Sequence, residues 1–133
     1  MNSKSIPNLE GKALSVLGPV NPADLGITLM HEHLVVTPMP SWTRKPGLET
    51  PATEAAFWDQ PLGLDNLSQA TVDHPFIRDQ YFLHDEKLSV AEVMEFKFGG
   101  GSTLVDLTSI GVGRDPEALR RIALSTGLQI IMG

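Results

Sequence analysis

Cysteine is absent from this chain of 133 residues. Its absence excludes disulfide bonds, thiolate catalysis and cysteine-ligated zinc, and leaves His, Asp, Glu and Lys as possible metal ligands. Basic residues are also scarce, since 10 Lys and Arg stand against 16 Asp and Glu, a formal net charge of −6. No block of about five or more basic residues occurs, so the chain lacks the phosphate-neutralising surface of a nucleic-acid-binding protein. The acidic balance equally disfavours binding to anionic membranes.

Long hydrophobic runs are missing as well. No apolar run approaches the roughly 18 residues that span a membrane. Residues 1–10 contain no apolar stretch of about seven residues, so we expect no secretory signal and a cytoplasmic protein. With 41% hydrophobic and 20% charged residues, the composition is that of an ordinary soluble globular chain. The length suits a single domain, residues 1–133, with a real core and no room for a second domain.

The most informative segment is an apolar run, residues 27–36, that contains two histidines. Its Ile, Leu, Val and Thr content predicts a short buried strand, although a buried helical turn has a similar composition. On a strand, His31 and His33 would project from the same face, roughly 6.6 Å apart along it, with Glu32 pointing away. Two such imidazoles can supply two ligands to a zinc or similar metal ion. The alternative is a pair of histidines on a half-exposed strand, one of them hydrogen-bonded in the core.

The segments on either side of this run are less informative. Residues 13–18 predict a short strand, followed by a turn that contains Pro19 and Pro22. Together with the histidine strand they would form an N-terminal β-hairpin, or a strand that caps the next element. Residues 37–85 are broken by prolines, with irregularly spaced aromatic residues. This segment is either a lid over whatever binds at the histidines or an insertion packed on the surface.

The last 45 residues predict an alternation of helix, strand, helix and strand with short linkers. That alternation is typical of a parallel α/β sheet with right-handed crossovers. Aspartate or serine caps, a proline in the first turn and glycines at the end predict the helix boundaries. The expected elements are a helix from a capping box at Ser89–Glu92 to Gly99–Gly101, a strand within 102–109, a helix from Asp115–Pro116 to Thr126–Gly127, and a strand at 128–132.

Polar side chains stand at the ends of two of these strands. His31 and His33 end the first, and Asp106 and Thr108 end the second. In α/β folds, chemistry collects at the carboxyl edge of the sheet. The same feature on two strands therefore favours a functional site there.

Four motifs in the chain resemble the phosphotriesterase-related family of the amidohydrolase superfamily. They are G-x-T-L-M-H-E-H-L from Gly26, G-G-x-x-T-L-V-D-L-T from Gly99, G-R-D-P-x-x-L from Gly113 and T-G-x-x-I from Thr126. The resemblance covers roughly residues 13–36 and 88–133. It implies a binuclear metal centre, usually zinc, that hydrolyses phosphotriesters, lactones or related small-molecule esters through a metal-activated hydroxide.

The same resemblance implies a role for several residues. His31 and His33 match the two ligands on strand one, which bind the more buried metal ion, and Asp106 matches a residue of strand two that is not a ligand. Arg114 and Asp115 match a structural motif in which Asp115 caps a helix. A complete (β/α)8 barrel takes about 250 residues. The chain is therefore expected to form only its N-terminal part, roughly strands 1–3 after a β-hairpin.

The family's other ligands belong to later strands, so an incomplete barrel truncated after about strand 3 should contain no catalytic residue beyond two metal ligands. Open strand edges and an uncovered inner face predict a poorly soluble or oligomeric, catalytically inert chain. Two kinds of partner would cover the open strand edges and the inner face. They are a complementing C-terminal half and further copies of the chain in a homo-oligomer.

Three hypotheses for function follow. The first is the N-terminal part of a zinc-dependent hydrolase that acts on ester bonds. The second is a non-enzymatic remnant or interaction module that retains at most weak metal binding. The third is a small domain that binds one metal ion through His31, His33 and either His74 or His84. The last two histidines are otherwise expected at the surface.

Overall fold

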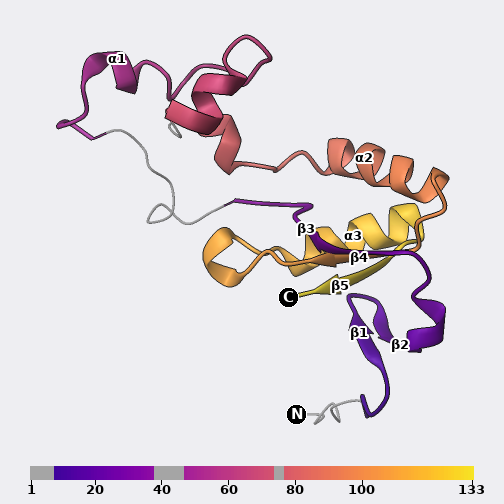
Figure 1. Ribbon diagram of the computed structural model, residues 1–133. Coiled ribbons are helices and arrows are strands. Elements are labelled where there is room, and N and C mark those ends of the chain that lie inside the picture. The colour runs from indigo at the N-terminus through magenta and orange to yellow at the C-terminus, as the bar shows by residue number, and fades with distance from the viewer. Residues whose placement is uncertain (1–7, 38–46, 74–76) are drawn as a thin grey trace.

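The computed structural model describes residues 8–37, 47–73 and 77–133. A five-stranded sheet in the order β2-β1-β5-β4-β3 forms its centre (Figure 1). The strands are β1 (Ala13–Ser15), β2 (Gly18–Val20), β3 (Thr28–Glu32), β4 (Thr103–Asp106) and β5 (Gln129–Met132). The helices are α1 (Ala52–Ala55), α2 (Glu86–Phe98) and α3 (Pro116–Thr126), with the short helical turns η1 (Pro22–Asp24), η2 (Gln69–Asp73), η3 (Arg78–Tyr81) and η4 (Ile110–Val112).

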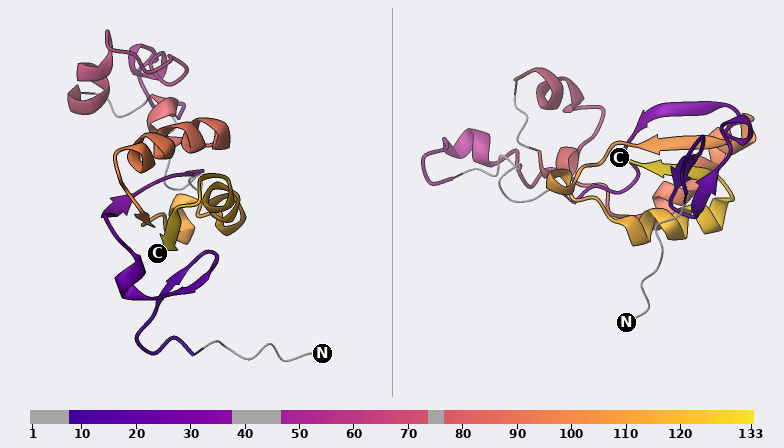
Figure 2. Two further views of the ribbon diagram at one scale, coloured as in Figure 1. Left: turned by 90° about the vertical axis from the view of Figure 1, so that its right-hand side faces the viewer. Right: turned by 90° about the horizontal axis from the view of Figure 1, so that it is seen from below.

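The strands β3, β4 and β5 are parallel, as the alternation of elements predicts. Leu104 pairs with Leu29 on one side and with Ile130 on the other, so strands that follow one another in the chain are neighbours in the sheet. The helices α2 and α3 form the two crossovers and lie on the same face of this sheet (Figure 2). The expected order of helix, strand, helix and strand is confirmed.

The hydrophobic core lies between the parallel strands and these two helices. α3 contributes most, because its apolar residues recur at helical spacing on the side that faces the sheet. α2 buries only Val93 fully. The cluster consists of Leu34, Val35, Val93, Leu104, Ala118, Leu119, Ile122, Ala123, Leu128 and Ile130.

α2 begins earlier than its capping box predicts. Asp85 is the N-cap, and its Oδ1 accepts hydrogen bonds from the backbone N–H groups of Lys87 and Leu88 at 2.9 and 3.1 Å. Ser89 therefore lies inside the first turn and does not cap the helix. Its hydroxyl donates to the carbonyl oxygen of Leu34 at 2.7 Å instead. The capping prediction at Ser89 is wrong because Asp85 satisfies the free N–H groups one turn sooner.

α3 has the boundaries that the sequence predicts. Asp115 Oδ1 accepts from the N–H of Ala118 at 3.0 Å, and Gly127 ends the helix with φ 69°. A two-pronged ion pair joins this helix to α2, because Arg121 donates to both carboxylate oxygens of Glu86 at 2.9 and 2.6 Å. Hydrogen bonding to the Arg121 guanidinium lowers the pKa of the Glu86 carboxyl.

An N-terminal hairpin is present, but its second strand is not the histidine strand. Ser15 pairs with Gly18, so the turn comprises residues 16 and 17, and Pro19 lies within β2. β2 is an edge strand, where proline's missing N–H breaks no ladder hydrogen bond. β1 also pairs with β5 between Ser15 and Ile131, which places the hairpin against the second edge of the parallel strands.

The histidine strand is shorter and more exposed than predicted. β3 ends at Glu32, and no residue within it is fully buried. Its position explains the difference, because β3 is the last strand of the sheet and has β4 as its one neighbour there. Burial resumes just after the strand, at Leu34, Val35 and Val36.

Residues 47–73 and 77–85 form a small layer of their own beyond the end of β3 (Figure 1). Trp58 and Ile77 are buried within it. The segment rejoins the sheet region through an antiparallel bridge between Val36 and Leu83, whose N···O distances are 2.7 and 2.9 Å. A role as a lid stays a prediction.

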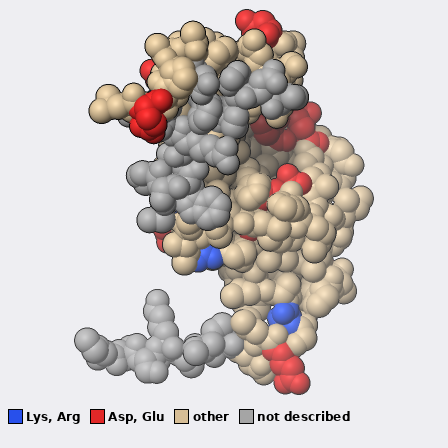
Figure 3. Space-filling model, turned by 60° about the vertical axis from the view of Figure 1, so that its left-hand side comes forward, with Lys and Arg blue, Asp and Glu red and all other residues tan. Residues whose placement is uncertain are grey.

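The surface carries mostly acidic charge. On the face shown in Figure 3, Asp and Glu occur over several elements, whereas Lys and Arg form small isolated areas. Among the helices of the described residues, none is both long and apolar enough to cross a membrane.

Candidate metal centre

A bulge near the end of β3 precedes the two histidines. Between Leu29 and Glu32 this strand advances three residues, while its partner β4 advances two, from Leu104 to Asp106. An extra residue of this kind bends a strand and redirects its side chains, and it is common beside functional sites. The irregularity includes His31, so the ring's direction depends on the bulge.

The imidazole rings of His31 and His33 lie side by side. Their centroids are 5.5 Å apart and the ring planes make an angle of 66°. Glu32, between them, pairs with Asp106 across the ladder. Both histidines are exposed to solvent. The predicted side-by-side placement is confirmed, whereas the role of the pair as metal ligands stays a prediction.

Thr108 supports the second histidine. The His33 Nδ1 atom lies 2.9 Å from the Thr108 hydroxyl oxygen, across 75 positions of the chain. Thr108 is fully buried, so its hydroxyl is held in place by the surrounding protein. With Nδ1 engaged in this way, the Nε2 atom of His33 is the nitrogen left for a metal ion.

The carboxylate of Asp106 organises the backbone around this contact. Its Oδ1 accepts from the N–H of Thr108 and its Oδ2 accepts from the N–H of Leu34, both at 2.8 Å. Asp106 is also fully buried. Asp106 thus holds the backbone at the ends of the two strands, and the expectation that it is not a metal ligand stays a prediction.

A third ligand is not found beside the histidine pair. No group of three or more His, Asp or Glu residues within metal-binding reach of one another occurs in the described ranges. His84, a candidate third ligand, is exposed as predicted and packs edge-on against Phe82, with ring centroids 6.3 Å apart. His84 does line the same cavity as His33, and its role as a third ligand stays a prediction. His74, the other candidate, lies outside the described residues.

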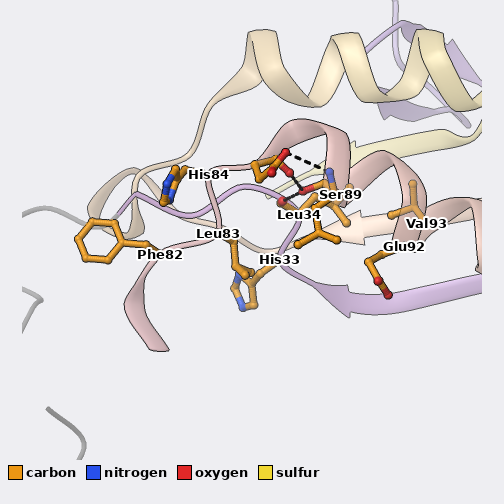
Figure 4. A pocket seen from close by; sticks show the side chains of 10 residues that line it. His33, Leu34, Phe82, Leu83, His84, Ser89, Glu92 and Val93 are labelled. Carbon is orange, nitrogen blue, oxygen red and sulfur yellow. Dashed lines mark hydrogen bonds between the residues drawn. The ribbon is translucent and has the colours of Figure 1, made fainter. Parts of the chain in front are cut away.

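A cavity of about 240 Å³ opens beside His33 (Figure 4). Residues 82–85 and the first turns of α2 form its walls, together with Leu34. Its charged lining residues are Asp85 and Glu92, and no Lys or Arg is among those described around it. The cavity thus offers an apolar surface with acidic groups, which suits an uncharged ligand better than an anion.

The histidine pair fits a zinc ion as part of a donor set. Neutral imidazole is a preferred zinc ligand, and a catalytic zinc site takes about three protein ligands with a fourth position open. His31 and His33 provide two nitrogens. The described residues therefore contain a partial site, whose completion requires further ligands.

The family model of the phosphotriesterase family matches residues 11–133. The chain belongs to the phosphotriesterase family. This confirms the resemblance found in the four motifs, and it extends the match through the middle segment, where the motifs carry no information.

Individual phosphotriesterase-family proteins match almost the whole chain. The N-acetyltaurine hydrolase of Homo sapiens is 35% identical over 134 residues, which cover 95% of this chain and 35% of that protein. A resiniferatoxin-binding protein from Rhodobacter sphaeroides is similar in structure, with TM-score 0.77 and 39% identity over 92% of this chain and 33% of that one. A lactonase from Listeria monocytogenes has TM-score 0.59 and 26% identity over 91% of this chain and 27% of its own.

These matches confirm the fold class as the N-terminal part of a (β/α)8 barrel. The parallel strands β3, β4 and β5 take the places of barrel strands one to three, with the β1–β2 hairpin before them. The chain spans about a third of the length of the relatives that it matches.

Thr108 and Leu34 are the site residues whose roles the sequence does not reveal. Thr108 stood out as a polar strand end, but its contact with His33 joins positions 75 residues apart. Leu34 contributes to the site through its backbone N–H, which donates to Asp106. Every residue except proline has such a group, so the sequence does not point to this position.

Proposed function

We propose that this chain supplies two metal ligands, His31 and His33, to a zinc-dependent hydrolase that acts on ester bonds. The observation that carries this proposal is the pair of imidazole rings 5.5 Å apart at the carboxyl end of the first parallel strand. Its membership in the phosphotriesterase family supports the same chemistry. A bound zinc ion would act as a Lewis acid towards the bond under attack.

The described residues have two different roles in this proposal, binding the ion and orienting the residues that bind it. His31 and His33 hold the ion, and Thr108 and Asp106 fix the direction of the second ring and the backbone beside it. The binuclear centre that we propose needs more ligands than these two nitrogens. A complementing C-terminal half would supply them, and until it does the chain on its own is inert.

The substrate that we propose is an uncharged ester, a phosphotriester, lactone or related compound. The apolar cavity beside His33, with its acidic rim at Asp85 and Glu92, supports a neutral group. An amide is the second candidate, favoured by the 35% identity to N-acetyltaurine hydrolase. A sulfonate such as that of taurine would find no basic side chain among the described residues of the cavity.

A different class of function, an interaction module without catalysis, also rests on an observation. Apolar side chains of β3 such as Met30, 67% exposed, remain uncovered in the described residues. Uncovered strands pair with other chains. Such a module would bind metal weakly or not at all, which separates it from the hydrolase proposal.

Zinc binding to the purified chain tests the site. Titration against a chromophoric chelator should show one zinc ion bound weakly by the wild type, and loss of that binding in His31→Ala and in His33→Ala. The comparison variant is His84→Ala, at an exposed histidine that also lines the cavity, which should bind zinc as the wild type does if His31 and His33 are the ligands. Equal zinc binding by all four proteins would remove His31 and His33 from the site.

A chimera tests the activity. Residues 13–133 would replace the matching segment of the human N-acetyltaurine hydrolase, whose remaining length is expected to provide the other ligands. We expect hydrolysis of a lactone, a phosphotriester or an N-acetyl amide, lost again in the His31→Ala chimera. A folded, zinc-loaded chimera that hydrolyses none of the three would refute the hydrolase and leave the interaction module.

A further inference from the structure

The contact between His33 and Thr108 engages one nitrogen of the imidazole ring, Nδ1. His33 Nδ1 and the Thr108 hydroxyl oxygen are 2.9 Å apart. A neutral imidazole carries its single proton on either Nδ1 or Nε2, and the nitrogen without a proton is the one that can bind a metal ion. A threonine hydroxyl can accept from Nδ1–H or donate to a bare Nδ1, so the direction of this hydrogen bond decides whether Nε2 is available.

The threonine is rigidly placed. Thr108 is 0% exposed, and its backbone N–H donates to Asp106 Oδ1 at 2.8 Å. The other oxygen of the same carboxylate accepts from the N–H of Leu34, the residue after His33, also at 2.8 Å. One buried carboxylate thus holds the backbone on both sides of the contact between the ring and the hydroxyl.

A second anchor ties this arrangement to α2. The hydroxyl of Ser89 donates to the carbonyl oxygen of Leu34 at 2.7 Å, so both backbone groups of Leu34 are bonded to buried or half-buried partners. His31 differs, because no hydrogen bond to its ring is seen within the described residues. Within the described residues, the structure therefore gives the ring of His33 a hydrogen-bonding support that it does not give the ring of His31.

We propose that Thr108 is a positioning residue that holds His33 in its Nδ1–H tautomer. The Thr108 hydroxyl oxygen accepts the Nδ1–H proton, and the lone pair of Nε2 is presented for metal binding. Hydrogen bonds of this outer kind typically change metal affinity by about 10- to 100-fold. The metal-binding part of this inference rests on the proposed function, whereas the tautomer is a property of the metal-free chain.

The tautomer can be measured directly. Long-range proton–nitrogen correlation spectra of metal-free chain 1–133, labelled with ¹⁵N-histidine, distinguish a protonated ring nitrogen from one with a lone pair. At a mildly alkaline pH of about 8, wild-type His33 should show Nδ1–H. Thr108→Ser keeps the hydroxyl and should keep this tautomer. Thr108→Val keeps the shape without an acceptor and should shift His33 towards Nε2–H.

A buried threonine elsewhere provides the matched control. Thr126 is 3% exposed and its hydroxyl donates to the carbonyl oxygen of Ile122 at 2.8 Å. Thr126→Val removes a buried hydroxyl as Thr108→Val does, but in α3 and away from the histidines. It should leave the His33 spectrum unchanged, so that general loosening of the fold is separated from loss of the contact.

Zinc affinity gives the second readout. Competition with a chromophoric chelator should show about tenfold weaker binding for Thr108→Val, with Thr108→Ser and Thr126→Val close to the wild type. An Nε2–H tautomer in wild-type His33 overturns the inference even if no variant folds. A tautomer that is the same in Thr108→Val and the wild type overturns it as well. Absence of zinc binding in the wild type, with the Nδ1–H tautomer observed, refutes the metal proposal and leaves the positioning role standing.

Discussion

The carboxylate of Asp106 joins the end of β4 to the backbone of Leu34, 72 residues earlier in the chain. The bond is 2.8 Å long, and it lies directly after His33. It connects two parallel strands at the edge of the sheet where we place the metal centre. The stability of the fold and the geometry of the site therefore depend on the same buried group.

Replacing Asp106 should destabilise the chain. Asp106→Asn keeps one acceptor and loses the other, which should cost about 1–2 kcal/mol of unfolding free energy, and Asp106→Ala should cost about 3 kcal/mol or more because two N–H groups lose their acceptors. Urea unfolding measures both. Asp79→Asn is the control, since exposed Asp79 also accepts from a backbone N–H, that of Leu62 at 3.1 Å, and should cost less than about 1 kcal/mol. Equal costs at the two positions would contradict the argument.

Gly113 should tolerate no side chain. Its φ is 84°, and a Cβ there would overlap the backbone of Thr37. Gly100 has a similar φ of 94° with nothing near the position of its Cβ. Gly100→Ala should therefore show backbone strain alone, about 1–2 kcal/mol, and Gly113→Ala about 3 kcal/mol or more because the clash adds to the strain. Thermal or urea unfolding of the pair gives the difference, and similar values for both variants would exclude the clash.

The ion pair between Glu86 and Arg121 should make stability depend on pH. Its hydrogen bonds lower the pKa of Glu86 from the ordinary 4.5. A lowered carboxyl pKa adds stability that is complete above 4.5 and is lost as the pH falls through the lowered value. The stability difference between wild type and Glu86→Gln should thus be small at pH about 7, because the pair is exposed, and should vanish in acid.

Melting temperatures measured from neutral pH down to acid test this expectation. Glu95→Gln is the matched control, since Glu95 is an exposed glutamate of the same helix. Its difference from the wild type should stay nearly constant across the range. If the difference in melting temperature between wild type and Glu86→Gln grew as the pH falls, its sign would contradict a lowered pKa of Glu86.

The uncovered edge strand should make the purified chain associate with itself. Ile27 and Met30 are 62% and 67% exposed on and beside β3. Sedimentation at increasing concentration should show oligomers, and Ile27→Lys with Met30→Lys should shift them towards monomers because edge lysines oppose strand pairing. Leu48→Lys, a substitution at an exposed residue outside the sheet, should change nothing. A wild-type chain that stays monomeric would contradict this prediction.

The chain alone should hydrolyse no ester, even with added zinc. The described residues offer two imidazole ligands where about three are needed for a catalytic site. Release of a chromogenic leaving group from a phosphotriester and from an aryl ester is the measurement, with His31→Ala as the blank. Zinc-dependent turnover that disappears in this variant would show that the chain completes its own site.

Local signals in the sequence were enough for the C-terminal half of the fold. Asp115 caps α3 and Gly127 ends it, because a cap and a left-handed turn are decided by neighbouring residues. The strands β4 and β5 follow from nearly continuous apolar runs. Local signals failed where two of them competed, as at Ser89, which lies inside α2 because Asp85 caps the helix first.

The sequence by itself was enough to predict the histidine pair, the family of the chain and the parallel order of the strands. Each of these predictions depends on motifs or on residues within a few positions of one another. The tertiary structure alone decided how the pair is held. Thr108 meets His33 across 75 positions, and Asp106 meets Leu34 across 72. Contacts over such separations exist only once parallel pairing has brought the ends of β3 and β4 to the same edge of the sheet.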